Sequence, residues 1–564
     1  MNRAPSLRFV ALLVLTAALL TGTALRAHEL SIKRQFDHDE AISYIAATGH
    51  EDQYEWAADG GLTDRWVPAA DWKKLMEPGK FWDFGAISAG LAHTDNHPPL
   101  YFWILHIWIA VAGVHLKAGI ALNILTTLAT GVVLFFLARR LLKDPLEAAL
   151  VVLVWDASPP TLPTSMIARQ YDLFAFFVAL FALLLVRATD LELPFRRRDF
   201  AALALVTAAG MLTHYQFVVV VATGLAYAAI FLLRRHRRRL LGVVGSFVAG
   251  LPIFLIAAPR FYLSVWGQAE SQAHGFSVSA LWVRVHNVAS GLYPWFGLAV
   301  SDLRAAPGFA AAATRPLWGP LASGAAAAAF GAALLCACAA LAIALALPGS
   351  RAKVRAYLGR IDTTGVVPAL VLLAGVAGGV IGMYLLFRSP VYAMHDRYLA
   401  PVWVMLAFLP VLVARLLIGR SRYVAVAVFL VLVMLPASLG RLHTLRNPSP
   451  NPGPALQAAS HVVIDGPNRA NCSRLLFWIN DATPVFVAWQ SQLRQHPDAW
   501  LPELRTGDLY LNLRIRSNTP SSFAATERLV GTRFAMHARR GGIRGVGRMF
   551  VLTEKAPSSS GTSP

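Results

Sequence analysis

The run LFAFFVALFALLLV, residues Leu173 to Val186, carries no charge and lies between Asp172 and Arg187. The chain of 564 residues is 56% hydrophobic and 15% charged, and its mean hydropathy of +0.51 is too high for a soluble protein of this size. Similar apolar runs are Phe9–Leu25, Leu100–Val114, Ile120–Leu137, Leu146–Trp155, Phe200–Leu212, Phe217–Leu233, Leu240–Ala258, Leu321–Leu347, Gly365–Phe387, Tyr398–Val413 and Tyr423–Leu439. Several are shorter than the roughly 20 residues that a perpendicular membrane helix needs. We predict an α-helical polytopic membrane protein with about 11–13 transmembrane helices, some extended by amphipathic flanks.

The first run, Phe9 to Leu25, has two interpretations. Arg3 and Arg8 precede it and Ala27 is a candidate cleavage point, as in a secretory signal. We interpret it as a retained helix, because acidic residues begin only about ten residues after it. A membrane anchor would hold those residues at a defined height.

Basic residues give the chain a formal net charge of +20, which could indicate a nucleic-acid partner. Much of the excess lies in short loops between apolar runs, and this distribution predicts cytoplasmic loops and no nucleic acid. These loops contain Arg139–Lys143, Arg196–Arg198, Arg234–Arg239, Arg351–Arg360 and Arg415–Arg422. Two spans between His97 and Arg139, however, would return the chain to the outer face. Either one of the two runs is re-entrant or divided differently, or Arg139 and Arg140 are an exception to the rule that basic loops lie in the cytoplasm.

The composition changes after residue 440. Residues 1–440 form the predicted transmembrane domain, with large outer loops at 28–97 and 259–320. A proline-rich linker, 441–456, leads to a small extramembrane α/β domain, 457–555, and a disordered tail, 556–564. Strands are expected at Arg474–Trp478, Val485–Ala488, Leu509–Leu513 and Met549–Thr553. Three cysteines are too few for a disulfide framework.

The strongest polar cluster follows the first run. Asp39 and Glu40 lie on a predicted amphipathic helix, Asp37 to Thr48, in which Asp37, Glu40 and Tyr44 share a face. Acidic residues in a first helical turn are also ordinary partners of the helix dipole. A carboxylate near the membrane boundary could instead take a proton from an acceptor hydroxyl, or hold a divalent cation.

Other polar groups lie at predicted helix ends on the same outer face. They are Asp95 with His97, Arg169 with Tyr171, His214 with Tyr215, and Arg397 with Tyr398. A guanidinium at such a place suits phosphate recognition. The prolines after His97 also fit a plain helix start, and His214 also fits a hydrogen-bonded core residue at a helix break. The aromatic residues of loop 259–320 fit either an acceptor lid or a belt at head-group depth.

The order of these motifs resembles the glycosyltransferase C superfamily, and more narrowly the bacterial relatives of protein O-mannosyltransferases. Those relatives include lipid A aminoarabinose and galacturonic acid transferases, and the resemblance covers roughly residues 8–440. It is carried by Asp39-Glu40, His97-Pro98-Pro99-Leu100-Tyr101, Ala168-Arg169-Gln170-Tyr171, His214-Tyr215 and Arg397-Tyr398-Leu399-Ala400-Pro401. Many relatives carry arginine where this chain has Ile42, and some carry lysine where it has His97. Phosphate contacts from those positions must be weaker here or be supplied by other residues.

The resemblance implies an inverting glycosyltransferase of the bacterial inner membrane, with its active site and C-terminal domain on the periplasmic side. It would move a sugar from a polyprenyl-phosphate carrier to lipid A or lipopolysaccharide, another envelope glycan, or a protein. Asp39 would be the base that deprotonates the acceptor hydroxyl, and Glu40 a supporting acid. The residues implied in binding the donor and its phosphate are Asp95, His97, Arg169, Tyr171, His214, Tyr215, Arg397 and Tyr398.

The sequence requires no cofactor, because a carrier phosphate is already a competent leaving group. A divalent cation, Mg²⁺ or Mn²⁺, held by Asp39 and Asp95 stays an option. The oligomeric state is not indicated.

Two other classes of function fit part of the pattern. A non-enzymatic polyprenyl-lipid flippase or transporter would also need basic residues in a membrane cavity. It would place charges along the transmembrane path, however, and it gives Asp39 no task. An O-antigen ligase or polymerase would place a basic groove outside, and the arginines of the terminal domain fit that alternative.

Overall fold

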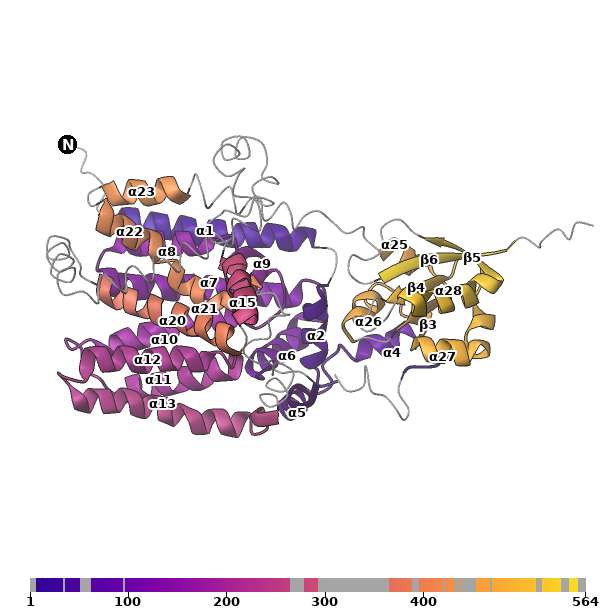
Figure 1. Cartoon of the computed structure of the whole chain (residues 1–564), viewed down its shortest axis with the longest axis horizontal. Helices are drawn as coiled ribbons and strands as arrows, with labels where there is room; N and C mark the ends of the chain where they lie inside the picture. The colour runs from indigo at the N-terminus through magenta and orange to yellow at the C-terminus, as the bar shows by residue number, and fades with distance from the viewer. Residues whose placement is uncertain are drawn as a thin grey trace, which may run out of the picture. The chain divides into compact units, whose positions relative to one another are not determined.

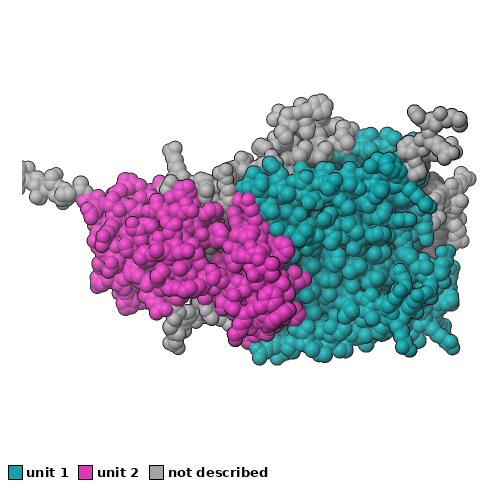
Figure 2. Space-filling model, turned by 180° about the vertical axis from the view of Figure 1, so that it is seen from behind, with its two compact units in different colours: residues 1–32, 96–101, 120–446 teal, residues 33–95, 102–119, 447–564 magenta. Residues whose placement is uncertain are grey.

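The computed structural model describes residues 7–33, 36–50, 62–94, 97–263, 278–292, 365–387, 395–418, 421–430, 434, 438, 453–466, 469–513, 520–538 and 547–555. The chain divides into two compact units, coloured separately in Figure 2. Unit 1 consists of residues 1–32, 96–101 and 120–446. Unit 2 consists of residues 33–95, 102–119 and 447–564.

Unit 1 is helical, and many of its helices lie alongside one another (Figure 1). Its elements are α1 (Leu7–Ile32), α7 (Ala118–Leu142, which starts in unit 2), α8 (Pro145–Asp156), α9 (Thr161–Ser165), α10 (Tyr171–Thr189), α11 (Arg197–Thr213), α12 (Phe217–Leu232), α13 (Arg237–Ala257), α15 (Val278–Leu292), α20 (Val366–Phe387), the 3₁₀-helix η3 (Asp396–Leu399), α21 (Ala400–Leu406), α22 (Leu409–Leu417) and α23 (Arg422–Phe429). The predicted polytopic helical fold is confirmed.

Six segments of the described chain are long and apolar enough to cross a membrane: α1, α7, α10, α13, Val366–Leu386 and Arg397–Leu417. Between His97 and Arg139, α7 is the one described helix of that length, because α6 (Leu100–Ala112) has only 13 residues. A single crossing between His97 and Arg139 would agree with the positive-inside distribution of the basic loops, and the number of crossings there stays a prediction. The total number of spans stays a prediction, since the run Leu321–Leu347 lies outside the described residues.

The helices of unit 1 pack closely where small residues face a neighbour. A Cβ atom at Gly250 of α13 would lie 2.8 Å from the Ala204 carbonyl oxygen of α11. A Cβ atom at Gly22 of α1 would lie 2.5 Å from the Asp156 carboxyl carbon of α8. Gly250 lets two helix backbones approach, and Gly22 leaves room for the Asp156 side chain; such close packing stabilises helix association in lipid, where the hydrophobic effect between helices is weak.

Ion pairs gather the basic loops at one end of unit 1. Arg140 at the end of α7 lies 3.4 Å from Asp190, which follows α10, and Arg187 lies 3.1 Å from Asp199 of α11. The buried Arg415 of α22 pairs with Glu147 of α8 at 3.0 Å and donates to the Leu142 carbonyl at the end of α7. The starts of α10 and α12 and the end of α11 lie at the other end of their helices. Unit 1 thus has a basic end and an opposite end, where the predicted site residues of α10 and α11 lie.

Unit 2 combines helices with one six-stranded sheet (Figure 1). Its elements are α2 (His38–Ala46), β1 (Trp66–Pro68), α4 (Ala69–Lys74), α5 (Phe84–Thr94), most of α6, α25 (Gly453–Ala458), β2 (Val462–Asp465), α26 (Arg469–Leu476), β3 (Pro484–Ala488), α27 (Gln490–Gln495), η6 (Pro497–Ala499), η7 (Leu501–Glu503), β4 (Leu509–Leu513), α28 (Pro520–Arg533), β5 (Phe534–Ala538) and β6 (Gly547–Glu554). The strand order is β1-β3-β2-β4-β6-β5, with β2 parallel to both β3 and β4. Phe486, Trp500 and Tyr510 belong to its buried core.

Two features of unit 2 differ from the sequence predictions. The segment Arg474–Trp478 was expected as a strand, but α26 ends at Leu476 and a turn follows. Parallel neighbours such as β2 and β3 need a crossover, and α26 provides it. The other three predicted strands are confirmed as β3, β4 and β6. The expected domain 457–555 is also only part of the unit, because β1 of the first loop pairs antiparallel with β3 at Trp66↔Phe486.

Candidate active site

Aromatic rings and one guanidinium gather at the end of unit 1 opposite the basic loops. The Tyr171 ring lies 5.8 Å from the His214 ring and 5.8 Å from the Tyr398 ring, measured between centroids. The His97 and His214 rings are 6.5 Å apart. The Arg397 Cζ atom lies 5.8 Å from the Tyr171 centroid and 5.4 Å from the Tyr398 centroid. The structure therefore brings together these five predicted residues, from four separate segments of the chain, in what we term the ring cluster.

His214 owes its place to a helix break. It ends α11 in an extended conformation (φ −156°, ψ 130°), and α12 begins at Phe217, as the sequence predicted. The His214 ring stacks on Phe174 at 4.7 Å, and its Nδ1 atom accepts the backbone N–H of Gln216 at 3.2 Å. With Nδ1 accepting, the neutral ring carries its hydrogen on Nε2, which can donate to an oxygen.

Arg397 contributes positive charge to the ring cluster. It lies in η3, beside two tyrosine rings whose faces attract a cation. Stacking uses the faces of the planar guanidinium, whereas a phosphate binds the N–H groups at its edge. The two tyrosine rings can therefore hold the Arg397 guanidinium in place for binding an anion such as phosphate at its edge.

Three further predicted residues, Arg169 and Tyr215 of unit 1 and Asp95 of unit 2, lie close in sequence to members of the ring cluster. Arg169 is buried, two residues before Tyr171 at the start of α10. Tyr215 follows His214 but packs in a separate apolar group with Leu212 and Phe254. Asp95 lies outside the described residues.

The two predicted acids lie on α2 in unit 2 and have different environments. Asp37 caps the helix: its side chain accepts the Asp39 N–H, and the Glu40 carboxylate accepts the Asp37 N–H at 3.0 Å. The Glu40 side chain is fully buried, 2.8 Å from the Lys33 ammonium. Burial raises the pKa of Glu40, and Lys33 opposes this rise.

Asp39 differs from its neighbour because its side chain is 20% exposed. Its Oδ1 atom lies 3.1 Å from the Nδ1 atom of His38, a residue that the sequence analysis did not single out. Its backbone is fixed on both sides, since its N–H donates to Asp37 and its carbonyl accepts from Ser43 at 3.1 Å. Asp39 is therefore the acid of α2 that solvent reaches, whereas Glu40 belongs to the helix cap.

A metal site finds no support in the described residues. Among them, no three His, Cys, Asp or Glu side chains lie close enough to hold one ion. Asp95, the proposed partner of Asp39, is outside this set. The divalent cation stays a prediction.

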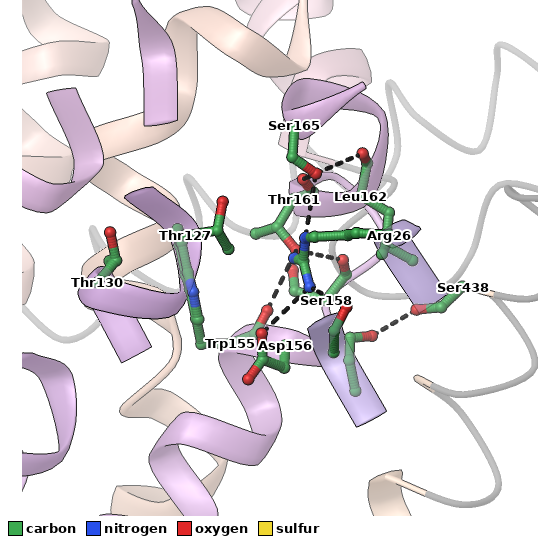
Figure 3. A network of polar contacts seen from close by, with 12 residues as sticks. Arg26, Thr127, Thr130, Trp155, Asp156, Ser158, Thr161, Leu162, Ser165 and Ser438 are labelled. Carbon is green, nitrogen blue, oxygen red and sulfur yellow. Dashed lines mark hydrogen bonds and ion pairs between the residues drawn. The ribbon is translucent and has the colours of Figure 1, made fainter. Parts of the chain in front are cut away.

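Sequence reasoning missed a buried ion pair in unit 1 (Figure 3). Arg26 of α1 is 1% exposed, and its Nη1 atom lies 3.2 Å from Oδ1 of Asp156, the last residue of α8. The same guanidinium donates to the Ser165 and Thr161 hydroxyls at 3.0 and 3.3 Å. Its charge also acts on the buried Asp172 of α10. The sequence held one signal for this pair: Arg26 directly follows the apolar run Phe9–Leu25, and the oppositely charged Asp156 directly follows the run Leu146–Trp155.

One continuous segment of the chain, most of it in unit 1, matches a known family. The model described as "Dolichyl-phosphate-mannose-protein mannosyltransferase" matches residues 96–263, less than a third of the chain. The predicted resemblance is confirmed over this segment. It contains His97, Arg169, Tyr171 and His214, whereas Asp39 and Arg397 lie outside the mannosyltransferase match.

Two solved structures are similar over almost the whole chain. Both are crystal structures of ArnT from Cupriavidus metallidurans. The one bound to undecaprenyl phosphate is 17% identical, with a TM-score of 0.47 over 97% of this chain and 98% of that chain. The apo structure is 17% identical, with a TM-score of 0.44 over 96% of this chain and 97% of that chain. A search of curated proteins gave no match.

Proposed function

We propose that this protein is an inverting membrane glycosyltransferase that takes a sugar from a polyprenyl-phosphate carrier and joins it to an acceptor hydroxyl outside the cytoplasmic membrane. The observation that carries the proposal is the ring cluster, with its cation beside two tyrosine rings at the end of unit 1 opposite the basic loops. Three of its members, His97, Tyr171 and His214, lie in the segment that matches a family named for a lipid-phosphate sugar donor.

In this proposal the ring cluster receives the donor head group. The carrier phosphate would bind the edge of Arg397, with Arg169 as a second cation and His214 as a donor to an oxygen. Tyr171 and Tyr398 would line the sugar site, since aromatic rings offer an apolar face to a sugar. Arg397 and Arg169 would neutralise the charge that builds on the departing phosphate.

Asp39 would act on the acceptor. The acceptor O–H proton moves to the Asp39 carboxylate as the oxygen attacks the anomeric carbon. The bond between that carbon and the phosphate oxygen breaks, and its electron pair leaves with the polyprenyl phosphate. Attack from the face opposite the leaving group inverts the anomeric carbon. The solvent-reached carboxylate of Asp39 supports this role better than the buried carboxylate of Glu40.

Mass spectrometry of envelope glycolipids and glycoproteins tests the proposal. Cells that carry the native chain, the Asp39→Asn variant, or no copy of the gene are compared. A sugar-sized mass found only with the native chain would establish transfer and identify both sugar and acceptor. Three identical glycan profiles with an altered lipid distribution would favour a flippase instead.

We expect Arg169→Ala to weaken donor binding by about 10- to 100-fold, the loss of one charge-assisted hydrogen bond, with little change in acceptor binding. Concentration series of donor and acceptor with purified protein check this. Arg198→Ala, at an exposed position on α11, makes the same change away from the ring cluster and serves as the control. If Arg169→Ala weakened the binding of donor and acceptor equally, the proposed role of Arg169 in phosphate binding would be contradicted.

The proposed orientation predicts which loops a membrane-impermeant thiol reagent reaches in intact cells. In a chain whose three native cysteines are replaced by serine, a cysteine at Glu503 should be labelled and one at Arg234 should not. Both positions are exposed in the structure, so burial does not explain a difference. If the reagent labelled the Arg234→Cys chain and not the Glu503→Cys chain, the proposed orientation would be wrong.

A further inference from the structure

The helix that carries Asp39 packs against the C-terminal part of the chain. Both α2 and α26 belong to unit 2, and they are in contact. The ring of Phe36, just before α2, meets the ring of Phe477, just after α26, edge to face at 4.8 Å between centroids. Phe36 is 1% exposed, so the two rings meet in a packed interior and not at the surface.

Arg474 of α26 makes the polar contact between these segments. Its Nε atom donates to the Phe36 carbonyl at 2.7 Å, one residue before the helix cap Asp37. Burial lowers the pKa of the Arg474 guanidinium, and the negative charges of Asp37 and Glu40 oppose this change. Arg474 therefore faces the acidic first turn of α2 and carries part of the charge that balances it.

The sheet gives α26 a fixed place. It connects β2 to β3, and β3 pairs with β1 of the first loop. Lys73 of α4 adds a second tie, since its Nζ atom donates to the Ile479 carbonyl and lies 2.6 Å from Asp481. The other side of α2 is held by Tyr44, whose hydroxyl donates to the His115 carbonyl and accepts the Gly119 N–H.

We propose that Arg474 is a positioning residue for Asp39, because it fixes the carbonyl and the charge at the start of the helix turn that carries this carboxylate. The C-terminal domain would then be part of the catalytic apparatus rather than an appendage. The inference rests on the proposed function, in which Asp39 is the base.

The test compares Arg474→Met, which keeps the length of the side chain but removes its charge and donors, with Arg474→Lys, which keeps a charge and a donor. Arg528→Met, at an exposed position on α28 of the same domain, is the matched control. Three quantities are measured for each: sugar transfer by mass spectrometry, binding of polyprenyl phosphate without a sugar, and the thermal midpoint in detergent.

We expect Arg474→Met to lower transfer by about 10- to 100-fold, the scale of a small misplacement of a reacting group. Binding of polyprenyl phosphate should stay unchanged, because the ring cluster belongs to unit 1. Arg474→Lys should recover part of the rate, and Arg528→Met should behave as the native chain. Transfer by Arg474→Met at the native rate would overturn the proposal. So would a loss of transfer that comes with equal losses of carrier binding and thermal stability.

A double variant separates positioning from general damage. If Arg474 acts through Asp39, adding Arg474→Met to Asp39→Asn should lower the residual rate by less than twofold, whereas independent effects multiply. Multiplied effects would overturn the inference. The proposed function fails separately, if the native chain transfers no sugar or Asp39→Asn transfers it normally.

Discussion

The Asp39→Asn variant is expected to lose sugar transfer by about 10²- to 10⁴-fold while staying folded in the membrane, the range typical of a missing general base. Asparagine has nearly the same size but takes no proton at neutral pH. The backbone contacts of Asp39 with Asp37 and Ser43 do not use its carboxylate, so α2 should keep its cap. Single-turnover transfer and binding of polyprenyl phosphate are the two measurements.

The control is Asp71→Asn. Asp71 lies in α4 of the same unit and pairs with Lys74 at 2.7 Å, at a more exposed position than Asp39. The Asp71→Asn variant should transfer sugar at the native rate. Near-native transfer by Asp39→Asn would remove the base assignment, and weak binding of the carrier would show that the change reached beyond the acid.

Removal of the Arg26 charge should have the largest effect on stability. Arg26→Met leaves the Asp156 carboxylate buried without its cation, which costs about 3–5 kcal/mol when one partner of a buried pair is lost. The thermal midpoint of the detergent-purified protein should fall accordingly. The polar contacts of Arg26 with Thr161 and Ser165 are lost as well, and they add to the cost.

A second substitution distinguishes charge from packing. Arg26→Met combined with Asp156→Asn removes both charges, so the double variant should regain much of the lost stability. If the Arg26→Met variant had the same thermal midpoint as the native chain, the stabilising role of the buried ion pair would be contradicted. The same pair predicts that α1 stays on the mature protein, and the intact mass of the purified chain checks this.

Local patterns in the sequence predicted the features that depend on local chemistry. Long apolar runs gave the helical membrane fold, the acid at Asp37 gave the start of α2, and the polar His214 gave the break between α11 and α12. The ring cluster was predicted in part, because its members sit at helix ends that the charge distribution placed on one face.

The features that were missed depend on residues far apart in the chain. The segment at Arg474 has the composition of a strand, and only the parallel pairing of β2 with β3 requires a helix there. The three residues of β1 are too few to show a strand period, and their partner lies at the other end of the sequence. Arg26 and Asp156 are 130 positions apart, so their opposite charges became a pair only when α1 and α8 were seen to pack together.

The pairing of β1 with β3 also limits when unit 2 can assemble during synthesis. Lys73 and Ile479, which it brings together, are 406 positions apart. At a synthesis rate of roughly 5–20 residues per second, the first loop waits about 20–80 s for its partner strand. Until then α2 lacks Arg474 and β1 lacks its partner strand. A ribosome that stops early should therefore release a chain with its membrane helices but without the Arg474 contact that holds the start of α2, so under the proposed function incomplete copies should transfer no sugar.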